Sequence, residues 1–237
     1  MTLPYLSLLH TEPIFLPSVG NLRIPTVNEI RKLGGLYAAY MEILCLDDSE
    51  LAERLNVPLS GTSRYKFVVA NHRIRDFYTQ IFNFFFLQDV AFQNTTQFWV
   101  LVENKDCIGT INEENFLDVC NAILICNHLE PKSNRPPVFY NEQARLIYEK
   151  MKQNPLKKKR HGLQASLADI VSALSANSHT YNLFNIWDLT VYQLYDQFYK
   201  VNQRVHFDVA SRQWAAYPSE KFDLSQWYSA PKQNKEE

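Results

Sequence analysis

Apolar positions recur at spacings of three and four residues along most of the chain, and this period predicts helices. Thr26 begins the first clear helix, because Glu29 follows three residues later and the two can satisfy each other's backbone N–H groups. The adjacent glycines Gly34 and Gly35 then end or kink that helix. Further helices are expected over residues 36–46, 49–55, 74–87, 141–151 and 167–174.

The pattern becomes extended between these helices. Residues 97–103 are rich in β-branched and aromatic side chains, residues 104–106 form a turn, and residues 107–111 return as the second strand of a hairpin. Asn112 is expected to cap the helix that follows. A further short strand is expected at 14–16. The chain is therefore predicted to have an α+β fold, predominantly α-helical, with one small antiparallel β-hairpin or sheet.

Three prolines between residues 131 and 137 mark a break in the pattern. This break predicts an N-terminal α+β domain over residues 1–132 and a C-terminal helical domain over 138–217. The polar residues 218–237 are expected to form a flexible tail.

The most regular pattern predicts a long helix over residues 186–209. Its apolar residues recur at spacings of four and three, as in a coiled-coil seam: Trp187, Val191, Leu194, Phe198, Val201 and Val205. A second row lies beside the seam: Leu189, Tyr192, Tyr195 and Tyr199. Such rows usually pack inside their own protein. The predicted helices 141–151 and 167–174, however, are short for so wide a face.

An aromatic face that the chain does not cover is typical of a site for a partner helix. We therefore expect protein binding, with possible self-association, at the following residues: Trp187, Val191, Tyr192, Leu194, Tyr195, Phe198 and Val201.

Composition narrows the function classes. The formal net charge is −1, which provides no overall field for nucleic acid or an anionic membrane. No apolar stretch is long enough to span a membrane, and the six glycines include no phosphate-binding loop. None of the four cysteines forms a C-x-x-C pair, so buried free thiols in a reducing compartment are expected.

Candidate chemistry is sparse. Asp89, Glu103 and Lys105 have the residue types of a metal-dependent nuclease, but Lys105 falls in the predicted turn rather than beside Glu103. The six histidines lack metal-ligand spacing, and no serine has the setting of a nucleophile. We therefore expect no catalytic, metal or cofactor site and no enzyme activity. The basic run Lys157–Arg160 resembles a nuclear import signal and could also contact phosphates, but a solvated linker between the two halves is the favoured interpretation.

The order of these features resembles the tail-assembly chaperone-type proteins of long-tailed phages that infect Gram-positive bacteria. The resemblance spans residues 22–216, and residues 187–198 are its most specific part. It is carried by features in this order: Tyr37 and Tyr40 in the first helices, the Phe-rich helix and hairpin, Asn115-Phe116, a basic-ended helix, residues 168–173 and residues 186–198.

The resemblance implies a non-enzymatic protein made in the cytoplasm of the infected bacterial host. Such proteins coat the long, helical tape-measure protein until tail-tube subunits replace them. Three alternatives stay open: a structural tail or baseplate component of the virion, the metal-dependent nuclease, and a host-directed effector.

Overall fold

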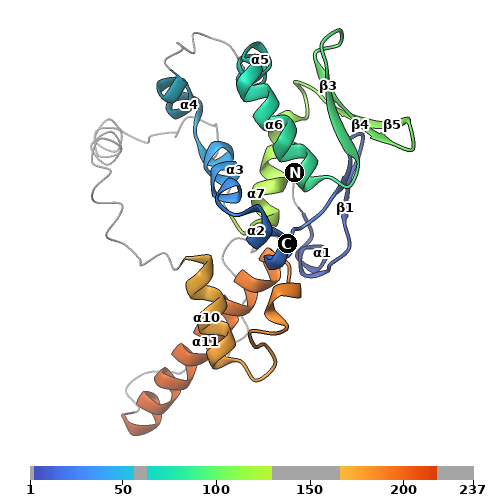
Figure 1. Ribbon diagram of the computed structural model, residues 1–237. Coiled ribbons are helices and arrows are strands. Elements are labelled where there is room, and N and C mark those ends of the chain that lie inside the picture. Colours follow the sequence, from blue (N-terminus) through green and yellow to red (C-terminus); the bar gives the residue numbers. More distant parts are fainter. Residues whose placement is uncertain (1–2, 56–62, 130–165, 218–237) are drawn as a thin grey trace.

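A computed structural model describes residues 3–55, 63–129 and 166–217 (Figure 1). The helices, in chain order, are α1 (Tyr5–Leu9), α2 (Val27–Leu33), α3 (Gly35–Cys45), α4 (Asp48–Leu55), α5 (Arg64–Ala70), α6 (His72–Phe85), α7 (Phe116–Cys126), α10 (Leu167–Asn177), the 3-10 helix η1 (Ile186–Asp188) and α11 (Val191–Ala216). The strands are β1 (Ile14–Leu16), β2 (Gly20–Leu22), β3 (Asp89–Gln93), β4 (Phe98–Glu103) and β5 (Asp106–Ile111). The α+β prediction is confirmed.

The described residues form two antiparallel sheets instead of the one that was predicted. The expected hairpin is present as β4 and β5, and β3 adds a third strand on the other side of β4. The short strand β1 pairs with β2 in a separate hairpin. Asn83 of α6 covers part of the outer edge of β3: its side chain donates to the Val90 carbonyl (2.7 Å) and accepts from the Val90 N–H (2.9 Å).

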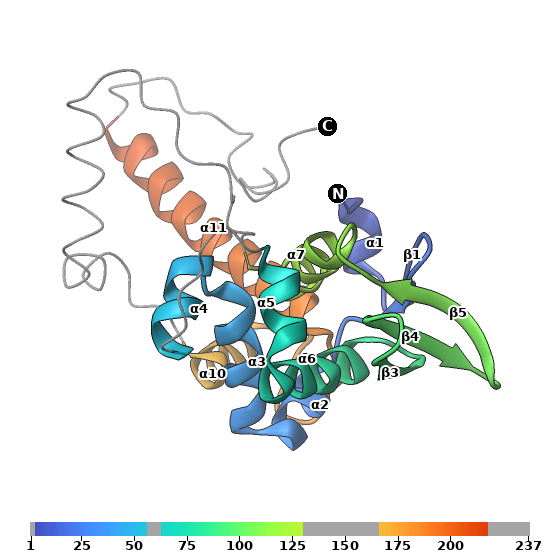
Figure 2. The same ribbon diagram turned by 90° about the horizontal axis from the view of Figure 1, so that it is seen from above.

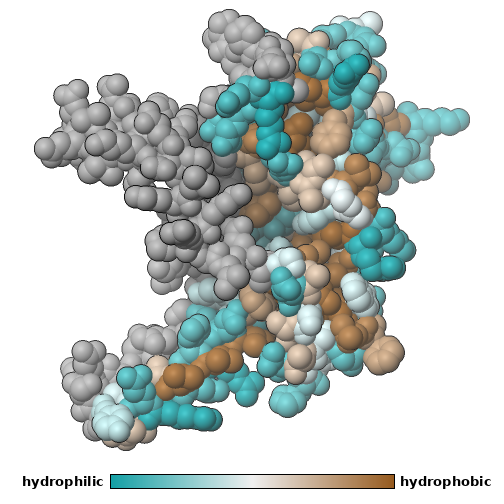
Figure 3. Space-filling view, turned by 60° about the vertical axis from the view of Figure 1, so that its left-hand side comes forward, coloured by the Kyte–Doolittle hydropathy of each residue, from teal (hydrophilic) through white to brown (hydrophobic). Residues whose placement is uncertain are grey.

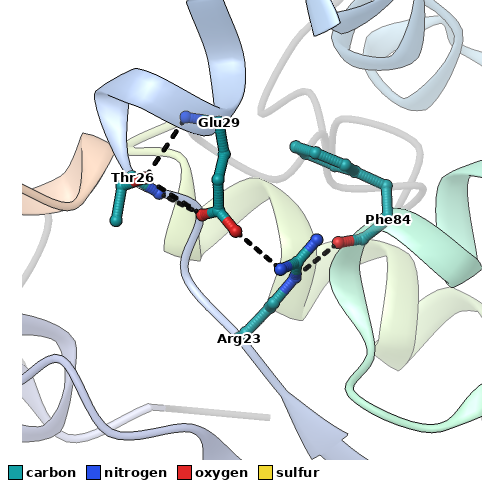
Figure 4. Close-up of polar contacts among 4 residues, drawn as sticks. All are labelled: Arg23, Thr26, Glu29 and Phe84. Atoms are coloured by element: carbon teal, nitrogen blue, oxygen red, sulfur yellow. Dashed lines mark hydrogen bonds and ion pairs between the residues drawn. The ribbon is translucent and has the colours of Figure 1, made fainter. Parts of the chain in front are cut away.

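The first predicted capping box is confirmed at α2. Thr26 Oγ1 accepts from the Glu29 N–H, and the Glu29 carboxylate accepts from the Thr26 N–H (Figure 4). The same carboxylate lies 2.7 Å from Arg23 Nη1, and Arg23 Nε donates to the Phe84 carbonyl. The cap of α2 is thereby fixed to the end of α6. Gly34 ends α2 with a φ of 64°, which glycine adopts easily.

The prediction that Asn112 caps the next helix is wrong. Helix α7 begins at Phe116, and Asn115 occupies the N-cap position. The Asn112 side chain instead accepts from the Glu114 N–H, and the Asn115 side chain donates to the Thr110 carbonyl. These local bonds stabilise a turn that delays the helix by one turn.

The core is centred on an aromatic cluster between α5, α6, α7 and the three-stranded sheet. Its members are Tyr65, Tyr78, Phe82, Trp99 and Phe116. Trp99 is fully buried, and its ring N–H donates to Thr79 Oγ1 (2.8 Å). The sheet is thereby fixed onto α6.

The buried side chain of Arg64 hydrogen-bonds to backbone carbonyls at the C-terminal end of α3. Arg64 donates to the carbonyls of Ile43 and Leu46 (both 2.7 Å) and to the Tyr78 hydroxyl. The last carbonyls of a helix need such donors, and a cation there is favourable to the helix dipole.

The remaining predicted helices can be compared only in part. Residues 49–55 and 167–174 are helical as expected, within α4 and α10. The predicted helix 74–87 is present as α6, which begins two residues earlier, at His72, and ends two residues earlier, at Phe85. The predicted helix 141–151, the proline break at 131–137, the Lys157–Arg160 run and the tail lie outside the described residues.

The C-terminal elements α10, η1 and α11 lie against one end of the part formed by residues 3–129, which we call the N-terminal body. Figure 1 shows α10 beside the first part of α11, with which it is in contact, and Figures 1 and 2 both show the rest of α11 projecting away as an arm. Contacts join α11 to α1 and η1 to α2.

A substitution at Gly109 of β5 tests how closely the two sheets approach each other. A Cβ there would lie 2.3 Å from the Val19 carbonyl oxygen and 2.6 Å from that of Ser18. Gly109→Ala is expected to lower the free energy of unfolding by about 2 kcal/mol, because backbone atoms must shift. Urea denaturation measures this. Gly35→Ala is the control, since its Cβ would meet nothing within 4 Å; equal losses in the two variants would refute the close approach.

Candidate functional site

The long helix differs from its prediction at both ends. Helix α11 begins at Val191, after a 3-10 turn at Ile186–Asp188, and it continues to Ala216. Thr190 forms a capping box with Gln193, and its extended backbone separates Trp187 from the helix. The heptad spacing from Trp187 onward therefore did not reflect one continuous helix. The T-x-x-Q sequence was the signal for the true start.

The N-termini of α11 and α2 meet in a short antiparallel bridge between Thr190 and Thr26. The Val191 N–H donates to the Pro25 carbonyl, and the Val27 N–H donates to the Leu189 carbonyl, both at 2.9 Å. The first N–H groups of a helix have no partner within the helix. Here each helix receives that partner from the segment leading into the other.

Helix α1 adds two further bonds to α11. The Tyr5 hydroxyl donates to Asp196 Oδ1 (2.5 Å), and Gln193 Nε2 donates to the Leu9 carbonyl (2.8 Å). Asp196 is only 3% exposed. Burial, and then the Asp196 carboxylate, raise the pKa of the Tyr5 hydroxyl, so this group stays a proton donor.

His128, just after α7, packs its ring against α11. Its ring centroid lies 5.1 Å from that of Tyr192 and 5.6 Å from that of Tyr195. Its Nε2 is buried and finds no hydrogen-bond partner within the described ranges. Burial lowers the pKa of His128, so the neutral ring is favoured.

Three predicted partner residues are part of the protein's own core. Val191, Tyr192 and Leu194 are 0%, 2% and 0% exposed, respectively. Val191 and Tyr192 join the main core, and Leu194 packs with α10. The prediction that these three contact a partner is corrected, because α10 and the N-terminal body cover them.

The other four predicted residues are partly buried against these clusters. Tyr195, Phe198 and Val201 pack beside the α10 cluster. Trp187 also packs there; its ring N–H donates to the Leu183 carbonyl (2.7 Å), and Arg31 lies over its ring. Their main contacts are within the chain.

The apolar face of α11 nevertheless continues beyond the part of the helix that packs against α10. Val205 and Val209 follow Val201 on the same helix face and are 54% and 62% exposed. Figure 3 shows an apolar strip along the projecting arm between hydrophilic atoms. We call Val205, Val209 and the surface between them the exposed seam. It lies one to two turns beyond the predicted partner site.

The candidate nuclease residues are not assembled. Asp89 pairs with Val102 across the sheet, so Glu103, the next residue, points to the opposite face. Lys105 lies in the turn with a φ of 74°. Across the described ranges, no group of three or more His, Cys, Asp or Glu side chains is placed to hold a metal ion.

All four cysteines have free thiols, but only Cys120 and Cys126 are buried as predicted, whereas Cys45 is half-buried and Cys107 is exposed. Cys120 and Cys126 are buried, and burial raises the pKa of each to about 12, which keeps them protonated and unreactive. Among the described residues, no helix has the length and apolar character needed to cross a membrane.

Comparison with known proteins adds one match. Residues 157–232 match the family model of the YomV second domain, which is a phage-type domain. Within that range the structure describes α10, η1 and α11. Searches of curated proteins and of solved structures found no significant match. The segment that carries the exposed seam is therefore similar to a phage-type domain.

Removing the side-chain cap of α11 tests the junction, by which we mean the hydrogen-bonded contact between the starts of α2 and α11. Thr190→Ala is expected to lower the free energy of unfolding by about 1 kcal/mol, because it removes the side-chain acceptor of the Gln193 N–H. Urea denaturation measures the loss. Ser166→Ala removes the equivalent cap of α10 away from the junction. When Thr26→Ala is combined with Thr190→Ala, the two losses of unfolding free energy should not add, whereas the losses of Thr26→Ala and Ser166→Ala should add. Equal departures from additivity in the two double variants would contradict a junction shared by α2 and α11.

The buried histidine predicts a pH dependence. Because the folded-state pKa of His128 lies below its ordinary 6.5, stability is complete above that value and falls as the pH drops toward the folded-state pKa. His128→Asn retains a residue that tolerates the positive φ of 59° but does not titrate. Its stability should vary less than wild type between about pH 7 and about pH 5. Parallel stability curves for the two proteins would contradict this assignment.

Proposed function

We propose that this chain is a non-enzymatic phage tail-assembly chaperone, which binds the tape-measure protein or another helical tail protein in the cytoplasm of the infected bacterial cell. The exposed seam is the observation that carries the proposal. It is an apolar strip on the second half of a helix whose first half, among the described residues, packs against α1 and α10.

The location of the seam supports a phage role. The match to the phage-type YomV second domain includes all of α11. The resemblance to tail-assembly chaperones covers the same segment and adds the partner class. Together they favour a partner that assembles with phage tails.

The arm is suited to reversible binding of another helix. Two exposed valines on one face can pack into the groove between side chains of a partner helix. So small an apolar area gives modest affinity at each contact, so a tube subunit can displace the chaperone. A long helical partner offers many such contacts along its length.

The proposed absence of catalysis is supported by the separation of the candidate nuclease groups. Asp89 and Glu103 face opposite sides of their sheet. Magnesium-dependent cleavage of DNA that depended on Glu103 would contradict the proposal.

Co-expression with a tape-measure protein tests the proposal. The wild-type chain should raise the soluble fraction of that protein several-fold, and Val205→Asp with Val209→Asp should abolish the gain by placing charges in the contact. The matched control is Leu6→Asp with Leu87→Asp, which changes two exposed apolar residues away from the seam.

Three outcomes oppose the proposal: no gain from wild type, an undiminished gain from the seam variant, or equal loss in the control. Mass spectrometry of purified mature phage separates the structural alternative. A chaperone should be absent from the particles, whereas a tail or baseplate component would be present in fixed copy number.

A further inference from the structure

The projecting part of α11 has two faces that differ in exposure. On one face, Val205 and Val209 of the exposed seam are 54% and 62% exposed. Residues two apart point in nearly opposite directions on an α-helix, so Gln203 and Phe207 lie well away from Val205. Four residues on this second face are only half-buried or less exposed than the valines, and we call them the half-buried stripe: Tyr199, Gln203, Phe207 and Ala210.

A cavity of about 530 Å³ lies along the half-buried stripe. Among the described residues its lining comes from α11 alone: Tyr199, Asn202, Gln203, His206, Phe207 and Ala210. The surface of a single helix is convex, so a cavity against it needs a second wall. Figures 1 and 2 show no described helix or strand beside the last turns of α11. The wall opposite α11 therefore belongs to another segment of the chain.

We propose that residues 218–232 fold back along α11 and pack on the half-buried stripe, with Leu224, Trp227 and Tyr228 as the contacting side chains. The backbone at the end of α11 supports a reversal of the chain. Tyr217 has a non-helical conformation (φ −138°, ψ 77°), and Pro218 follows it, so the chain leaves the helix axis at this point.

The segment after the helix is long enough for this contact. Residues 218–232 span roughly 22 Å as a helix and about 50 Å when fully extended. Gln203 lies roughly 20 Å from Ala216 along α11. In either conformation the segment therefore reaches Gln203, Phe207 and Ala210.

The extent of the family match favours this segment as the cover. The match to the YomV second domain does not stop with α11 but continues to residue 232. The matched segment after the helix contains four large apolar side chains, which would be costly to leave in water: Phe222, Leu224, Trp227 and Tyr228. Residues 130–165 are the other long segment outside the described ranges, and most of them lie outside the match.

This contact goes beyond the proposed function, because it lies within one chain. The exposed seam is on another face of α11 and stays uncovered. A second layer along the half-buried stripe stiffens the arm that carries the seam, because a helix packed along one side bends less than a lone helix.

Thiol labelling of the full chain tests the contact. Ala210→Cys places a thiol in the half-buried stripe, and Val209→Cys places the matched control thiol on the exposed seam, one residue away. Maleimide should react with the thiol at residue 210 roughly tenfold more slowly than with the thiol at residue 209, because a covered thiol reacts only after local opening. Mass spectrometry of the separated peptides measures each thiol by itself, so the native cysteines stay in place.

Variants of the segment identify the cover. Adding Leu224→Asp with Trp227→Asp to Ala210→Cys should raise the labelling rate roughly tenfold, to the rate at residue 209. Trp227→Ala, which adds no charge, should raise the rate to a smaller extent. The control is Ile147→Asp with Tyr148→Asp, which changes two apolar residues between 130 and 165 and should leave the rate unchanged.

Three outcomes would overturn the contact. The first is equal labelling of residues 209 and 210 in the otherwise wild-type chain, which needs no change after α11. The second is protection of residue 210 that survives both changes at Trp227. The third is loss of protection in the control, which would assign the cover to residues 130–165. No tail protein is present in these measurements, so failure here is distinct from failure of the chaperone proposal.

Discussion

The reciprocal hydrogen bonding between the starts of α2 and α11 is the constraint on which the rest of the C-terminal structure depends. Each helix needs an acceptor for its first N–H group, and each obtains it from the residue that precedes the cap of the other. This arrangement brings two positive helix ends together, which is unfavourable. The Glu29 carboxylate, held by Thr26 and Arg23, offsets that charge (Figure 4).

The junction explains why one apolar seam has two different roles. Fixing the start of α11 at Thr190 places Val191 and Tyr192 in the main core and sets Leu194 against α10. Helix α10 ends at Asn177, and α11 continues past its cover. The same face then leaves Val205 and Val209 exposed. An anchored first half holds an exposed second half at a defined position, which reduces the ordering cost of binding a partner.

Local signals in the sequence predicted most of the described elements, whereas the site required tertiary information. The Thr26 capping box, the glycine break and the β4–β5 hairpin depend on neighbouring residues, and each was confirmed. The partner face was placed too early along the chain because periodicity shows that residues share a face but not where a neighbour ends. The start of α11 was missed for a related reason: Trp187 fits the heptad spacing even though extended backbone at Leu189 interrupts the helix. The side-chain cap of β3 by Asn83 has no sequence signal, since it joins residues in different elements.

The central claim is that α11 changes from core helix to exposed arm along a single face. Carbene footprinting with residue-level mass spectrometry tests it most directly, on dilute chain without any partner. The account predicts strong labelling of Val205 and Val209 together with protection of Val191 and Leu194. Comparable labelling of all four residues would show that the junction does not hold the helix, and protection of all four would show that no seam is available.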